Sequence, residues 1–185
     1  MQNLRSILLA VIIVAIFFCF CSDKNKQQTA TPAYGAFSFE HKLTLPGRPE
    51  IIYDAITGDI SGWWDHSFSG SPKKFCIEAK PGGGFWEIFN DNGDGVLHAT
   101  VIFAQRGKML RFDGPLGLSE KAIQVVTTYA FAPVPHDSTQ LTVSIHAAGE
   151  MEKGIDEIVK NVWYHFLFER FKPYVEAGKH LAKIN

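Results

Sequence analysis

The chain has 185 residues, a net charge of −1 and no basic block, which excludes the electrostatic footprint of a typical nucleic-acid-binding protein. Its length suits one domain with a sizeable core. Aromatic residues make up 13% of the chain, with 15 Phe. Because each aromatic side chain buries a large area, this composition predicts a well-filled core or a lined cavity.

Residues 1–20 have the pattern of a signal peptide. Ile7–Phe20 is an unbroken apolar run of 14 residues. A run of this length is shorter than the roughly 20 residues that span a bilayer and is typical of a signal-peptide core. The polar residues that follow, 21–36, are interpreted as a flexible linker.

An apolar run, a cysteine and a polar tether together resemble a bacterial lipoprotein leader. The resemblance implies that Cys21 is lipidated, with Cys19 as the alternative. Phe18 and Phe20 depart from the Leu and small residues of the usual motif. An uncleaved N-terminal anchor and simple secretion remain open. All three readings place the domain outside the cytoplasm, either in the cell envelope or secreted.

Cys76 is the one cysteine beyond residue 21. It therefore has no partner for a disulfide within the domain. It lies in a strand-like run, which favours an apolar structural role over that of a nucleophile.

The folded domain is expected at residues 37–180, and its first part contains one strand and two short helices. Ala36–Leu45 alternates apolar and polar residues as a strand with one buried face does. Arg48–Thr57, with a proline near its start, predicts a short helix. Ile60–Asp65 predicts a second short helical turn that carries two tryptophans.

Six strands are predicted next; glycine-containing turns join the first five, and Pro133–Ser138 joins the last two. Their ranges are Lys74–Ala79, Phe85–Phe89, Val96–Ala104, Met109–Asp113, Ala122–Ala132 and Thr139–Ala148. Residues 81–85 lead from one strand into another, so they favour a hairpin turn over a phosphate-binding loop. Counted as a calcium loop from Asn90, the segment lacks the Asp of position 1 and has Val101 at position 12, where Glu is required. Asn92-Gly93 instead favours a tight hairpin turn.

Ile155–Gly178 is the one long segment that reads clearly as a helix, and its apolar surface is wide. At 100° per residue the helix has two apolar stripes, and together they swing around the axis from the first half to the second. We expect the first stripe to roof a pocket and the second to clamp the helix to a sheet. The first contains Ile155, Ile158, Val159, Val162 and Phe166, and the second contains Trp163, Leu167, Phe171 and Tyr174.

These elements predict an α+β fold in which a curved antiparallel sheet wraps around the long C-terminal helix. A sheet with one apolar face and a single apolar helix pack on each other, and a long antiparallel sheet curls as it twists. We expect a space between them that the two short helices after the first strand close at one end.

The order of elements and several local signatures resemble the START/Bet v 1-like (SRPBCC) superfamily, in its AHSA1-like and polyketide-cyclase-like branch. The signatures are Trp63-Trp64, Gly83-Gly84-Phe85, Asn92-Gly93-Asp94-Gly95, Gly107–Phe112, the Gly114–Gly117 loop, Ser138–Thr142 and the final helix. The resemblance implies a helix-grip fold. It implies no single function, because this superfamily includes carriers, receptors, cyclases and chaperone activators.

Candidate ligand-binding residues are the apolar and aromatic side chains expected to face the space between sheet and helix. They are Trp63, Trp64, Phe85, Phe89, Phe112, Thr127, Tyr129, Val159, Val162, Trp163 and Phe166, with Leu116 and Leu118 as a flexible lip. No cofactor is expected.

The pattern favours no catalytic residue, although Glu87, His98 and Tyr129 are weak candidates. Glu87 and His98 are interpreted as a cross-strand pair on the surface. If Glu87 pointed inward, we would expect a raised pKa. His165 and Glu169, four residues apart, are interpreted as the solvated side of the helix, and no metal site is predicted.

The sequence thus favours a binding module tethered to the membrane that holds a hydrophobic small molecule or a lipid. A cyclase/aromatase-like or hydrolase-like enzyme that uses the same cavity is one alternative. A protein-interaction domain like the chaperone activators is another. The leader argues against the latter, because that chaperone partner is cytosolic. The oligomeric state does not follow from the sequence.

Overall fold

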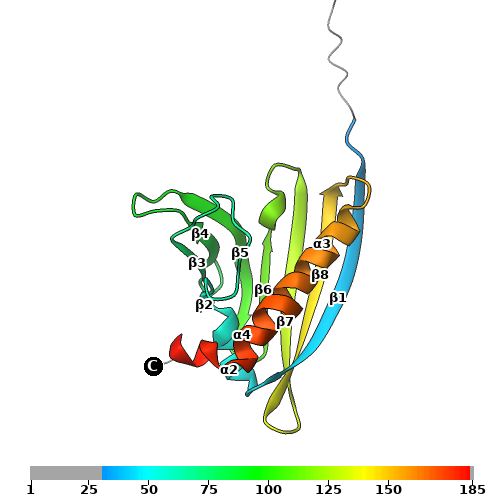
Figure 1. Ribbon diagram of the computed structural model, residues 1–185. Helices are drawn as coiled ribbons and strands as arrows, with labels where there is room; N and C mark the ends of the chain where they lie inside the picture. The colour runs from blue at the N-terminus through cyan, green and yellow to red at the C-terminus, as the bar shows by residue number, and fades with distance from the viewer. Residues whose placement is uncertain (1–30, 184–185) are drawn as a thin grey trace, which may run out of the picture. The chain divides into compact units, whose positions relative to one another are not determined.

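The computed structural model describes residues 31–183 and has an α+β fold. Eight antiparallel strands form one curved sheet in the order β1-β8-β7-β6-β5-β4-β3-β2. A long C-terminal helix lies across the sheet (Figure 1). The strands are β1 (Tyr34–Pro46), β2 (Gly58–Asp59), β3 (Lys74–Ile77), β4 (Gly84–Ile88), β5 (Gly95–Gln105), β6 (Met109–Gly114), β7 (Ile123–Val134) and β8 (Ser138–Glu150).

The predicted helix-grip architecture is confirmed, and its boundaries are refined at two points. β1 begins at Tyr34, which pairs with Glu150 of β8, so residues 34–36 belong to the sheet and not to the linker. Helix α2 (Pro49–Ile56) forms where the first short helix was predicted. The second predicted short helix is only a turn, in which the Trp63 and Trp64 amides donate to the Ile60 carbonyl, because β2 occupies the preceding residues.

The long helix consists of three consecutive parts. They are α3 (Ile155–Tyr164), a π-helical segment (His165–Phe171) and α4 (Lys172–Glu176). The Lys172 amide donates to the Leu167 carbonyl five residues earlier, which is the π-helical pattern. Pro173 explains this winding in part, because it has no N–H for the Glu169 carbonyl and its ring would crowd that carbonyl.

The core lies between the concave face of the sheet and the helix. Alternate residues of β7 and β8 point inward, including Val125, Tyr129, Val143 and Ile145, all at most 1% exposed. Short 3₁₀ helices follow β6 (η1, Leu116–Leu118) and α4 (η3, Lys179–Lys183). Among residues 31–183, no helix is long and apolar enough to span a membrane.

Candidate functional site: a pocket between the sheet and the C-terminal helix

A pocket of about 610 Å³ opens between the helix, the loop after Trp64 and the η1 loop. Its size falls within the range of small-molecule sites. Its walls are mostly apolar, with a few polar side chains at one side. The lining residues are Trp64, Asp65, His66, Ser67, Phe68, His98, Leu116, Gly117, Leu118, Val125, Ile158, Val159, Val162, Trp163 and Phe166.

Stacked aromatic rings join the Trp64 loop to the helix. The Trp64 ring stacks on the Phe166 ring with an interplanar angle of 16° and a centroid distance of 3.8 Å. The indole N–H of Trp64 donates to the His66 carbonyl at 3.0 Å. Gly62 allows the turn to approach α4, since a Cβ there would lie 2.8 Å from the Tyr174 ring. These contacts fix the position of residues 64–66 beside the helix.

Glu87 lies inside the molecule, at 0% exposure, so the interpretation of Glu87 and His98 as a surface pair is wrong. The carboxylate accepts four hydrogen bonds, two from Ser69, one from the Ser67 hydroxyl at 2.5 Å and one from the Phe68 amide at 3.0 Å. Burial raises the pKa of Glu87, but these donors outweigh burial and hold the pKa below its ordinary value. The expected rise in pKa is therefore wrong as well, because donors surround the carboxylate.

A β-bulge turns His98 inward. Phe85 pairs with Ala99 and Trp86 pairs with Leu97, so His98 is the extra residue of β5. A bulge of this kind re-aims a side chain, and here both His98 and Ala99 are buried. His98 lines the pocket, and its Nε2 lies 3.3 Å from Oε2 of Glu87. Burial lowers the pKa of His98, although the Glu87 charge opposes this.

The η1 loop closes the pocket beside His98. Gly114 lets the end of β6 approach β5, because a Cβ there would lie 2.6 Å from the His98 carbonyl oxygen. Leu116 has a φ of +51°, a conformation that is uncommon for residues other than glycine, and its side chain is buried against the pocket. Leu116 and Leu118 were predicted to form a lip, and both line the pocket.

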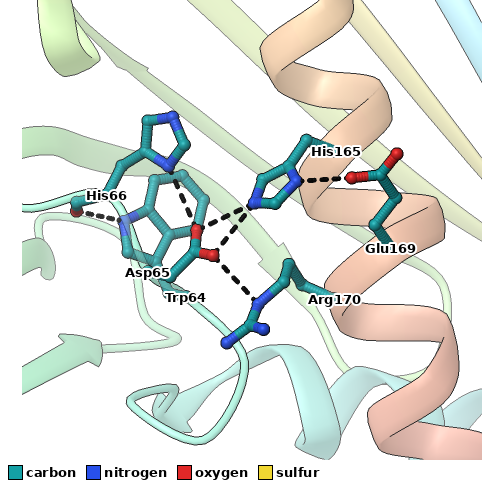
Figure 2. A network of polar contacts seen from close by, with 6 residues as sticks. All are labelled: Trp64, Asp65, His66, His165, Glu169 and Arg170. Atoms are coloured by element: carbon teal, nitrogen blue, oxygen red, sulfur yellow. Dashed lines mark hydrogen bonds and ion pairs between the residues drawn. The ribbon is translucent and has the colours of Figure 1, made fainter.

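A cluster of polar side chains (Figure 2) lies at the pocket, which Asp65 and His66 of the cluster line. We call it the polar rim. The Oδ2 atom of Asp65 lies 2.9 Å from Nε2 of His165 and 3.0 Å from Nε of Arg170. His165 also contacts Glu169 at 2.7 Å. These carboxylates, Glu169 first, raise the pKa of His165. Burial raises the pKa of Asp65, but its histidine and arginine partners lower it below the ordinary value.

All but one of the predicted ligand-binding residues fall into two groups. Trp64, Val159, Val162, Trp163 and Phe166 line the pocket. A second set is buried in the core behind the pocket: Trp63, Phe85, Phe112, Thr127 and Tyr129. Phe89 belongs to neither set, because it is half-buried just after β4. Burial raises the pKa of the Tyr129 phenol, which keeps that group neutral.

Sequence reasoning missed the polar side of the pocket. It did not single out Asp65, His66 or Phe68, and it assigned His165 to the solvated face of the helix. The short run Trp-Trp-Asp-His was the available signal, because a polar pair directly after two tryptophans lies at the edge of an aromatic cluster. Asp65 and His165 are 100 residues apart in the chain. Local residue spacing therefore could not predict their contact.

No protein-family model matches the chain, and the comparison with curated proteins found no match. Solved structures do match. A protein from Rhizobium leguminosarum superposes with a TM-score of 0.59 at 10% identity, over 80% of this chain and 99% of that one. A Mesorhizobium loti protein gives 0.55 at 18% identity, over 76% and 98%.

DynU16, a protein from the dynemicin biosynthetic locus, gives a TM-score of 0.53 at 17% identity. The match covers 76% of this chain and 48% of that one. Identities this low establish similarity of fold alone. The matches therefore support a helix-grip-like fold and leave function to be argued from the pocket.

Proposed function

We propose that this chain is an extracytoplasmic binding module that holds a hydrophobic small molecule or a lipid between the sheet and helix α3. The supporting observation is the pocket of about 610 Å³, whose walls are mostly apolar. Small-molecule sites combine such walls with a few polar groups that orient the ligand. Asp65, His66 and His98 supply those groups here.

The proposal includes membership of the START/Bet v 1-like superfamily and tethering to the membrane through Cys21. The order of the strands, the long final helix and the solved structures of similar fold support the family assignment. The tether rests on the apolar run and the polar stretch at residues 7–36. Cys21, Cys19 and the signal peptide lie outside the described residues.

An enzyme of the cyclase/aromatase or hydrolase type is the second candidate, and titratable groups at the pocket favour it. His98, Asp65 and His66 all line the pocket, and proton transfer requires such groups near a substrate. Glu87, however, is held by four donors and does not line the pocket. The binding role is therefore preferred.

Co-purification of the ligand tests the proposal. The full-length chain would be purified in detergent from its bacterial host, and bound molecules would be extracted and identified by mass spectrometry. Val162→Trp fills the pocket from the helix. Ile102→Trp is the matched control, because Ile102 is an exposed apolar residue of β5 outside the pocket lining.

We expect one class of apolar molecule to accompany the wild type and Ile102→Trp and to be lost from Val162→Trp. Equal recovery from all three chains, or none from any, would contradict the binding proposal. If the captured molecule is converted by the wild type but not by His98→Gln, the enzyme alternative is favoured instead.

A further inference from the structure

Three side chains with metal-binding atoms meet at the polar rim of the pocket. Asp65 and His66 come from the loop after Trp64, and His165 comes from the helix (Figure 2). One ligand atom from each lies within 4.8 Å of the others. The Asp65 carboxylate lies 3.1 Å from His66 Nδ1 and 2.9 Å from His165 Nε2. Ligands of one small cation are spaced in this way.

We propose that Asp65, His66 and His165 form a binding site for a divalent transition metal of the zinc class. Two imidazoles and one carboxylate suit Zn²⁺ and its first-row neighbours and not Mg²⁺ or Ca²⁺, which prefer oxygen. Three protein ligands leave a position for water or for an oxygen of a bound molecule. Because Asp65 and His66 also line the pocket, the metal would lie at its rim.

Neighbouring residues orient the ligands as they do in known metal sites. Glu169 Oε2 lies 2.7 Å from His165 Nδ1. A proton on Nδ1 that is donated to Glu169 leaves Nε2, which faces Asp65, as the metal-binding nitrogen. Carboxylate–histidine pairs of this kind fix the tautomer and raise the basicity of metal ligands. The Trp64 indole holds the His66 backbone carbonyl at 3.0 Å.

Arg170 provides an internal control on the proposal. Its Nε lies 3.0 Å from Asp65 Oδ2, so its charge would repel a dication bound to that carboxylate. Replacing Arg170 by glutamine should therefore tighten metal binding. A network that merely cross-links the loop to the helix predicts no metal binding in any variant. The metal site goes beyond the proposed function, since an apolar ligand needs no metal.

Metal titration of the full-length chain tests the site. Chelator-treated protein would be titrated with Zn²⁺ by calorimetry and with Co²⁺ by visible absorption, which reports nitrogen and oxygen ligation. We expect one equivalent to bind. His66→Ala and His165→Ala should each weaken binding at least about 10-fold, and Glu169→Gln by about 10- to 100-fold. Arg170→Gln should strengthen binding.

His146→Ala is the matched control, because His146 is an exposed histidine of β8 and should leave binding unchanged. His66→Ala removes an exposed side chain, so it remains informative if His165→Ala fails to fold. No binding by the wild type, or equal affinity in the wild type, His66→Ala and His146→Ala, overturns the metal site. Either result leaves the pocket proposal intact, because that proposal is measured by recovery of an apolar ligand.

Discussion

Glu87 is the residue where burial and hydrogen bonding compete most directly. It is fully buried, yet its carboxylate accepts bonds from Ser67, Phe68 and Ser69. Hydrogen bonds to a charged acceptor are stronger than those between neutral groups. The carboxylate therefore holds the 67–69 loop in place by hydrogen bonds. Ser67 and Phe68 of this loop line the pocket.

We predict that Glu87→Gln lowers the free energy of unfolding by about 1–3 kcal/mol at neutral pH. Glutamine loses the charge and presents an NH₂ group toward donors. Because the folded-state pKa of Glu87 lies below its ordinary value of 4.5, its contribution is present above that value and is lost as the pH falls through the folded pKa. The difference between wild type and variant should therefore shrink below about pH 4.5. Urea denaturation at several pH values measures it.

Glu40→Gln is the control for this prediction, because Glu40 is an exposed glutamate of β1 that bonds Ser144. Its effect should stay within about 0.5 kcal/mol. A difference between wild type and Glu87→Gln that stays constant down to pH 3.5 would refute the charge-based explanation and leave a packing effect.

The alternation of residues in β4 predicted the face on which Glu87 lies. Alternation placed it on the face of β4 that also carries Phe85, and both are buried. The pairing with His98 was predicted, but its place on the surface was wrong. Val96 is the direct strand partner of Glu87, and His98 reaches the buried carboxylate only through the bulge. A one-residue bulge leaves no clear trace in a strand pattern. The donors come from Ser67, Phe68 and Ser69, about 20 residues earlier in the chain.

At the scale of elements, the winding of the C-terminal helix explains the unusual arrangement of its apolar residues. At a regular 100° per residue its apolar surface swings around the axis. The π-helical segment takes more residues per turn, so side chains spaced by four keep one direction. Trp163, Leu167 and Phe171 are all buried. The apparent rotation of the apolar surface around the helix axis therefore reflects under-winding of the helix. In the sequence, only Pro173 indicated where the under-wound segment lies.

The two halves of the helix are predicted to differ in what they support. Phe171 is fully buried against Trp63, so Phe171→Ala should cost about 3–5 kcal/mol of unfolding free energy. Ile158 is 58% exposed at the pocket. Ile158→Ala should change stability by no more than about 0.5 kcal/mol while reducing recovery of the bound apolar molecule. Thermal or urea denaturation and ligand extraction measure the two effects.

Tyr164→Ala serves as the control for Ile158→Ala, because Tyr164 is about half exposed on the same helix and does not line the pocket. It should leave ligand recovery unchanged. If Ile158→Ala and Tyr164→Ala retain the ligand equally, the Ile158 side chain does not hold it.

At the scale of the molecule, the fold could be predicted because its signals are repeated along the chain. Alternation in β7 and β8, glycine turns between hairpins and one long helix all favour the same sheet-and-helix arrangement. The pocket could be predicted only as a region. Its polar rim joins Asp65 to His165, and its inner wall depends on the bulge at His98. Both are long-range or irregular features, which periodicity does not encode.

The proposed tether through Cys21 predicts that membrane attachment depends on a lipid. The apolar run of 14 residues before Cys21 is too short to span a bilayer comfortably, so attachment should require a lipid on that cysteine. The full-length wild type should sediment with membranes and carry the added mass of acyl chains. Cys21→Ser should lack that mass, and intact-protein mass spectrometry with membrane fractionation distinguishes the two.

Cysteine variants at other positions make this prediction specific. Cys76→Ser, in β3 of the folded domain, should keep the lipid and the membrane attachment. Loss of the lipid in Cys19→Ser but not in Cys21→Ser would move the modification to the neighbouring cysteine. Membrane attachment without added mass in the wild type would contradict lipidation and favour an uncleaved anchor, because an acyl chain adds mass whereas a retained apolar segment holds the chain by its own side chains.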